Sequence, residues 1–162
     1  MNIRAGLIAA IVFIMDRWSK HLVETRLDPY GHVIVIPGFF DIVRSENTGV
    51  AFGLFTNSES HYKVALLIIF SIGALLMLAW LLWRNRGSEP YSQAAIALIF
   101  GGALGNVFDR VRFGSVTDFL DFYAGSYHWY TFNVADTAIS VGAGLLLLGM
   151  LRKSAVERKA TA

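Results

Sequence analysis

The residues of this chain that are best suited to carry out chemistry are aspartates at the ends of long apolar stretches. Asp136 opens the last apolar stretch, Asp109 closes the stretch before it, and Asp118 lies on the short connection between them. A carboxylate is costly to keep at membrane depth, and such residues usually serve a functional site. These three aspartates are therefore the first candidates for a site.

Two aspartates held close together cannot both ionise cheaply, so the pair tends to share one proton. The ionised partner takes a proton from water, while the protonated partner polarises a carbonyl and later protonates a leaving amine. This is aspartic-type peptide hydrolysis. A pair such as Asp109 and Asp136 can instead relay protons or bind a cation in a small carrier. A structural subunit of a membrane assembly is a third possibility, and residue chemistry alone leaves all three open.

The composition is that of a membrane protein. Of the 162 residues 55% are hydrophobic, and the mean hydropathy is +0.51, which is too apolar for an ordinary soluble domain. The absence of cysteine excludes disulfides, zinc–thiolate sites, iron–sulfur clusters and thiol nucleophiles. The four histidines show no ligand spacing, so we expect neither a metal nor another cofactor. The basic residues are scattered or flank apolar spans, and we expect no nucleic-acid partner.

Four membrane-spanning helices are predicted, and the second is the clearest. It is 20 residues long, which at ~1.5 Å per residue covers a hydrocarbon core of ~30 Å. The first is interrupted by Asp16, Arg17 and Lys20. Its apolar start resembles a signal-peptide core, but no small-residue cleavage site follows, so we expect a retained span. The predicted spans are about 4–23, 64–83, 92–108 and 134–151.

The basic residues near the span ends predict the orientation. Seven of the 14 lie on one side, and several of the other seven lie beside acids in polar motifs, where we interpret them as site or ion-pair residues. Both termini are then cytoplasmic and the aspartate-bearing ends face outward. The seven that set this orientation are Arg4, Arg84, Arg86, Arg152, Lys153, Arg158 and Lys159.

Two outer connections join the spans of what we expect to be a single domain, 1–162. In the first, 24–62, the β-branched run His32–Ile36 predicts a strand, with Phe39–Val43 and Gly49–Phe55 as possible partners in a small sheet at the membrane surface. The second, 111–130, is rich in aromatic residues and predicts a short amphipathic connection at the interface. The fold class is thus mainly α, with four transmembrane helices and a small outer sheet.

Polar residues gather toward the outer ends of three spans, which predicts one shared polar site. Asp16 and Lys20 are spaced as an ion pair on one helical face, and we interpret this pair as structural. Asp109 and Arg110 have the same interpretation, Asp121 is taken as a solvated loop acid, and the glycines of the last two spans are taken as packing residues. Asp118 and Asp136 are better candidates for a functional role than these acids, because neither has a basic residue within a helical turn of it in the sequence. The remaining members of the polar clusters are Asn106, Asn133 and Ser140.

Five motifs appear in an order that closely resembles the bacterial lipoprotein signal peptidases, also called signal peptidase II. The resemblance extends from Asp16 to about Ile139 and shows no departure at the motif positions. The motifs are Asp16-Arg17-Trp18-Ser19-Lys20, Asn47-Thr48-Gly49-Val50-Ala51-Phe52, Gly101 to Arg110, Val116-Thr117-Asp118-Phe119 and Phe132-Asn133-Val134-Ala135-Asp136.

This resemblance implies an aspartic peptidase of the bacterial inner membrane with four transmembrane helices. Such an enzyme cuts prolipoproteins just before a cysteine that carries diacylglyceryl, releases the signal peptide, and binds the cyclic peptide antibiotic globomycin. By the same resemblance, the catalytic aspartates are Asp118 and Asp136, and we expect a monomer without a cofactor. The residues expected to bind substrate or inhibitor, or to support the site, are Asn47, Gly49, Asn106, Arg110, Asn133, Asp16 and Lys20.

Overall fold

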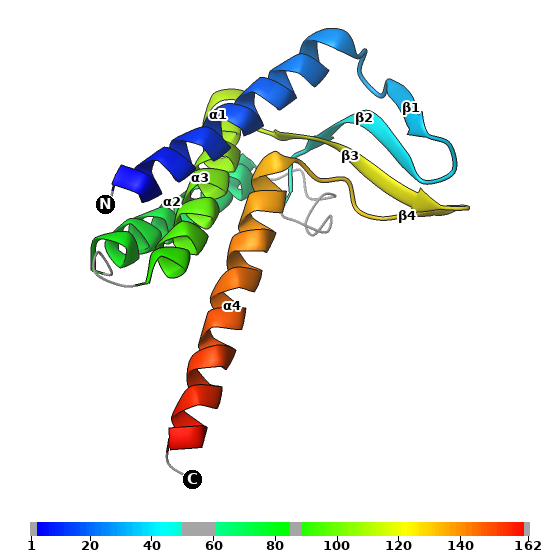
Figure 1. The fold of residues 1–162 in the computed structure, drawn as a ribbon. Helices are drawn as coiled ribbons and strands as arrows, with labels where there is room; N and C mark the ends of the chain where they lie inside the picture. The colour runs from blue at the N-terminus through cyan, green and yellow to red at the C-terminus, as the bar shows by residue number, and fades with distance from the viewer. Residues whose placement is uncertain (1–2, 50–60, 85–88, 161–162) are drawn as a thin grey trace.

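The computed structural model describes residues 3–49, 61–84 and 89–160. Within these ranges the chain forms long helices and a small antiparallel sheet at one end of them (Figure 1). The N- and C-termini lie on the side of the molecule away from the sheet. The elements are α1 (Ile3–Arg26), β1 (His32–Ile36), β2 (Phe40–Asn47), α2 (His61–Arg84), α3 (Pro90–Phe113), β3 (Val116–Ala124), β4 (Tyr127–His128) and α4 (Val134–Ala160).

Small residues let α1, α3 and α4 approach one another closely. A Cβ atom added at Gly101 of α3 would meet the backbone of Ala9 in α1, and one added at Gly102 would meet the backbone of Ala135 in α4. Helices in a membrane depend on such contacts, because lipid offers no hydrophobic force to bring them together. The prediction that the glycines of the last two spans serve packing is confirmed for Gly101 and Gly102 but is wrong for Gly144, where a Cβ would meet nothing within 4 Å. Gly101 and Gly102 place the polar ends of three helices against one another.

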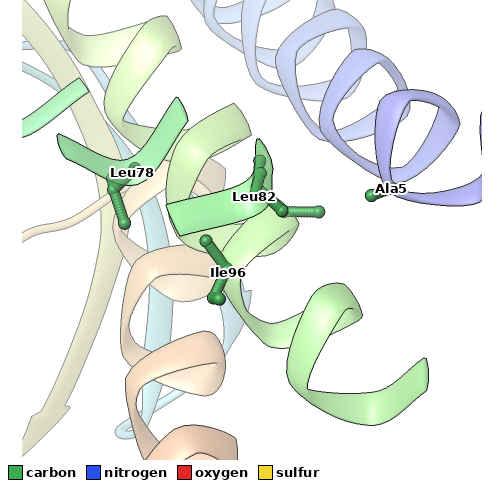
Figure 2. Packing of buried hydrophobic residues seen from close by; sticks show 5 residues of the cluster. Ala5, Leu78, Leu82 and Ile96 are labelled. Atoms are coloured by element: carbon green, nitrogen blue, oxygen red, sulfur yellow. The ribbon is translucent and has the colours of Figure 1, made fainter. Parts of the chain in front are cut away.

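Helix α2 packs on the side of α3. Leu78 and Leu82 of α2 meet Ile96 of α3 and Ala5 of α1 in a buried cluster (Figure 2). Only 6% of the most apolar 18-residue stretch of α2 is buried inside the protein. The exposed surface of this helix is rich in large apolar side chains. Such a surface suits contact with lipid tails rather than water.

Three helices of the described ranges, at 64–84, 90–113 and 134–152, are long and apolar enough to cross a membrane. The predicted first span is a helix, but its charged residues keep it outside that set. Helix α3 continues beyond the predicted end of the third span at residue 108, to Phe113. Asp109 is buried and Arg110 half-buried near its end, whereas Arg112 is exposed. The helix ends where Gly114 adopts a φ of 78° and its N–H bonds to Arg110 O at 3.1 Å.

The sheet has the strand order β1-β2-β3-β4, with all neighbours antiparallel. The predicted strand at His32–Ile36 is confirmed, as is a partner beginning near Phe40. The second connection was predicted as a short amphipathic interfacial segment without a stated secondary structure, and its residues Val116–Ala124 form the strand β3. The β-branched and aromatic residues of this segment favour a strand. Most of the other expected partner, Gly49–Phe55, lies outside the described residues.

The partner strand for β2 therefore comes from the second connection, more than 60 residues later in the chain. Phe122 of β3 stacks on Phe40 of β2 with ring centroids 4.6 Å apart and on Phe132 at 5.8 Å. The pairing places Asp118 opposite Ser45. Asp118 thus sits on a strand that pairs with β2 along one edge and, toward its end, with β4 along the other. The strand follows the end of α3 (Figure 1) and contacts α1 and α3.

Candidate active site

The carboxylate of Asp118 is held by two asparagine side chains from different elements. Asn47, the last residue of β2, donates its amide N–H to Asp118 Oδ2 at 3.0 Å. Asn133, just before α4, donates to Asp118 Oδ1 at 2.6 Å. Asp118 is 2% exposed. Both oxygens are therefore fixed in direction by neutral donors, and no cation forms a salt bridge with the carboxylate among the described residues.

Asp136 lies in the first turn of α4, and the local sequence explains its place. The side-chain oxygen of Asn133 accepts the Asp136 N–H at 3.0 Å, which is the usual role of asparagine at a helix N-cap. A carboxylate in the first turn also interacts favourably with the helix dipole. Asn106 of α3 donates its amide to Asp136 Oδ1 at 2.8 Å. One residue, Asn133, thus links the two candidate carboxylates.

Burial raises the pKa of the Asp118 carboxyl, and the charge of Asp136 raises it further. The amide donors Asn47 and Asn133 act in the opposite direction because they favour the ionised form, yet the pKa of Asp118 is raised to about 6. The two carboxylates interact electrostatically across the site. A pair in which one member holds a proton near pH 6 can act as acid and base at once.

The raised pKa of Asp118 predicts a pH-dependent stability. Because the pKa is about 6 in the folded chain against an ordinary value of 3.8, the folded state binds more protons than the unfolded state between these values. The free energy of unfolding should therefore fall as pH rises from about 4 to about 6, by on the order of 2 kcal/mol, and stay lowered above that. Thermal unfolding in detergent across this range measures the effect. In Asp118→Asn the dependence should be weaker, and an equal dependence would show that Asp118 is not its source.

Lys20 is the centre of a buried charge cluster that joins α1 to α3. Its ammonium group donates to Asp16 Oδ2 at 2.8 Å and to Asp109 Oδ2 at 2.7 Å. Arg17 binds the other oxygen of Asp109. The predicted ion pair of Asp16 and Lys20 is confirmed. Asp109 is bound to two cations, and this local neutralisation argues against the carrier interpretation, in which Asp109 exchanges protons.

Arg110 and Gly49 complete the group of predicted site residues. Arg110 donates from one terminal nitrogen to the Gly49 carbonyl at 3.0 Å and from the other to the Asn106 carbonyl at 3.4 Å. The Gly49 N–H bonds in turn to Asn47 Oδ1 at 2.8 Å. These bonds connect Arg110 and Gly49 to Asn47 and Asn106, which contact the two aspartates. Ser140, which was also predicted to belong to the shared polar site, is exposed. Arg110 Nε is buried and has no hydrogen-bond partner among the described residues.

Some contacts near the site were not predicted from the sequence. Thr117, next to Asp118, donates its hydroxyl to Glu24 Oε1 of α1 at 2.7 Å. Asp121 was taken as a solvated loop acid, and this was wrong, because it is 6% exposed and lies 2.8 Å from His128 Nδ1. Thr117 and Glu24 lie 93 residues apart in the sequence, so no local sequence pattern predicts their contact. Within the described residues, no group of acidic and histidine side chains is arranged to hold a metal ion.

Comparisons with known proteins agree with this geometry. Residues 8–152 match the family described as Signal peptidase (SPase) II. The chain is 50% identical over 145 residues to the lipoprotein signal peptidase of Solibacter usitatus, covering 90% of this chain and 88% of that protein. It is 44% identical over 146 residues to the lipoprotein signal peptidase of Syntrophotalea carbinolica, covering 90% and 89%.

Solved structures show the same fold. One described as a bacterial membrane enzyme, determined by the in meso method at 2.3 Å, superposes with a TM-score of 0.85 at 31% identity and covers 95% of this chain and 91% of its own. A second, described in the same words at 1.9 Å, gives a TM-score of 0.81 at 32% identity and covers 93% and 94%. Matches of this extent in sequence and structure establish that the chain belongs to the signal peptidase II family.

Proposed function

We propose that this protein is an aspartic endopeptidase that removes the signal peptide from diacylglyceryl-modified prolipoproteins by cutting before the lipidated cysteine, with Asp118 and Asp136 as its catalytic residues. The observation that carries the proposal is the pair of carboxylates presented by β3 and α4, whose side-chain hydrogen-bond donors within the described residues are asparagine amides. Such donors fix direction without neutralising charge. The family membership of the chain supplies the reaction class.

In this mechanism the pair holds one proton at the start. The ionised carboxylate takes a proton from a water molecule, whose oxygen attacks the scissile carbonyl carbon. The protonated carboxyl donates a hydrogen bond to the carbonyl oxygen as negative charge develops there. The nitrogen of the leaving amine is then protonated, the C–N bond breaks, and the pair returns to a single shared proton. No metal ion takes part in the bond-breaking step.

The other polar residues have positioning and binding roles in this proposal. Asn47, Asn106 and Asn133 hold the two carboxylates in the directions needed for attack. Arg110, whose Nε is buried and has no hydrogen-bond partner among the described residues, binds a carbonyl of the substrate peptide beside Gly49 in this proposal. Globomycin, a cyclic peptide, would occupy the same positions.

We place four helices across the bacterial inner membrane, with both termini cytoplasmic and the sheet on the outer side. The charges of α1 support its place as the fourth span, because Asp16 and Lys20 are 0% exposed and face protein. The residues that α1 exposes are large and apolar at helical spacing, which suits lipid contact. This stripe consists of Leu7, Ile11, Ile14, Met15, Trp18 and Leu22. The proposed enzyme is a single domain and acts as a monomer.

Cleavage by the purified protein in detergent tests the proposed function. A diacylglyceryl-modified prolipoprotein should be cut, the mature product should begin with the lipidated cysteine by mass spectrometry, and globomycin should prevent the cut. The matched substrate is the same precursor without the diacylglyceryl group, which should be cut much more slowly. A folded protein that leaves both precursors intact would exclude this function.

A further inference from the structure

We propose that Lys20 is a positioning residue, which orients the side-chain amide of Asn106 so that its N–H group faces Asp136. The inference rests on the proposed catalytic role of Asp136. It gives the buried ion pair of α1 a specific task in the reaction, in addition to holding helices together.

The contacts of Lys20 determine which way the amide of Asn106 points. The ammonium group is 0% exposed and makes its third hydrogen bond to Asn106 Oδ1 at 2.9 Å. An ammonium group can only donate, so the atom of Asn106 that faces it must be the oxygen. The amide nitrogen is then directed away from Lys20 and donates to Asp136 Oδ1 at 2.8 Å. The amide of Asn133 also donates to Asn106 Oδ1, at the longer distance of 3.4 Å, so Lys20 supplies the shorter and charged donor of the two that hold this orientation.

The orientation of this amide matters for the reaction because it decides whether an N–H donor or an oxygen atom faces the Asp136 carboxylate. An N–H donor favours the ionised carboxylate, whereas an amide oxygen in its place would favour the protonated form. The other charged groups that act on Asp136 come from β3 and α3, namely Asp118 and Arg110. From α1, Asp16 accepts the N–H of Ala135, the residue before Asp136, at 2.9 Å. None of these contacts sets the direction of the Asn106 amide.

The charge cluster also supplies a matched control. Lys20 and Arg17 are both cations bound to Asp109, but in the described contacts only Lys20 reaches Asn106. Replacing either residue with methionine removes one positive charge from the same cluster. A difference between the two variants therefore reports on what Lys20 does beyond binding Asp109. Because the charge of Lys20 also acts on Asp118, the charge-balanced variant Lys20→Met/Asp109→Asn is needed to separate the amide from the loss of charge.

The experiment compares kcat and KM as functions of pH for Lys20→Met, Arg17→Met and the parent, with the lipid-modified precursor. In Lys20→Met we expect kcat to fall about 100-fold at neutral pH, and the acidic limb of the kcat profile to move up by about one pH unit. KM should change little. Arg17→Met should keep the parental shape of the profile. Because Lys20→Met leaves excess negative charge in a buried cluster, the charge-balanced variant Lys20→Met/Asp109→Asn is measured beside it and should show the same shift.

A folded Lys20 variant whose acidic limb matches that of the parent would overturn the proposal, as would an equal shift in Arg17→Met. If neither Lys20 variant folds, Asn106→Asp decides, because it keeps an oxygen toward Lys20 and places a second oxygen against Asp136. An unchanged acidic limb in that variant would also refute the inference. Failure of the proposed function itself is distinguishable, because the parent would then cut no precursor at any pH.

Discussion

Changing Asp118 to asparagine should lower kcat for the lipid-modified precursor at least about 1,000-fold while the protein stays folded. Asparagine has nearly the same shape but neither donates a proton as an acid nor accepts one as a base, and general acid–base groups contribute about this much to a rate. Asp136→Asn should have an effect of the same size. Initial rates in detergent, with thermal unfolding as a measure of folding, test both variants.

The double variant Asp118→Asn/Asp136→Asn should be no slower than the slower single variant, because residues that act as one unit give losses that do not add. A product of the two single losses would instead mean that the aspartates act independently. This comparison tests the shared role of the pair, which neither single substitution can do.

Asp121→Asn is the matched control for Asp118. Asp121 is also a buried aspartate of β3, but it lies three positions after Asp118, so the two side chains point to opposite faces of the sheet. Its partner is His128 rather than an asparagine of the site. We expect its activity to stay within a few-fold of the parent. A folded and fully active Asp118→Asn would remove Asp118 from the catalytic pair, whereas equal losses in both variants would indicate damage to the sheet.

The second large effect is expected from Gly102→Ala, a substitution away from every proposed catalytic atom. The new Cβ would collide with the carbonyl oxygen of Ala135, which is backbone and cannot turn aside. Helix α4 must then move away from α3 by a few tenths of an ångström or more. We expect a loss of stability of about 1–3 kcal/mol from overpacking and a fall in kcat of about 100-fold, because Asp136 follows Ala135 directly.

Gly144→Ala separates this close contact from the general effect of adding a methyl group to a helix. Gly144 lies on α4 as well, but a Cβ there would meet nothing within 4 Å. Alanine favours the helix by about 1 kcal/mol over glycine, so activity should be unchanged and thermal stability equal or higher. Rates and unfolding temperatures of the two variants give the comparison. Full activity in Gly102→Ala would mean that the helix contact does not set the position of Asp136.

The sequence by itself determined the helices and the residue types of the site. Apolar stretches of about 20 residues can satisfy their backbone groups in lipid only as helices, so their existence followed from length and hydropathy. The placement of Asp136 also followed from local chemistry, because Asn133 caps the helix that carries it. The order of the polar motifs was sufficient to indicate the family, which the comparisons confirm.

Only the tertiary structure decided how these residues meet. Asp118 lies on a strand because β3 finds a partner in β2, a pairing between segments that are far apart in the chain and carry no mark of each other. The three acceptors around Lys20 come from α1 and α3, and a sequence shows only the one on its own helix. Helical spacing identifies neighbours three or four residues away, whereas contacts between helices depend on which faces pack. Those faces are fixed by glycines whose role appears only when a second backbone lies against them.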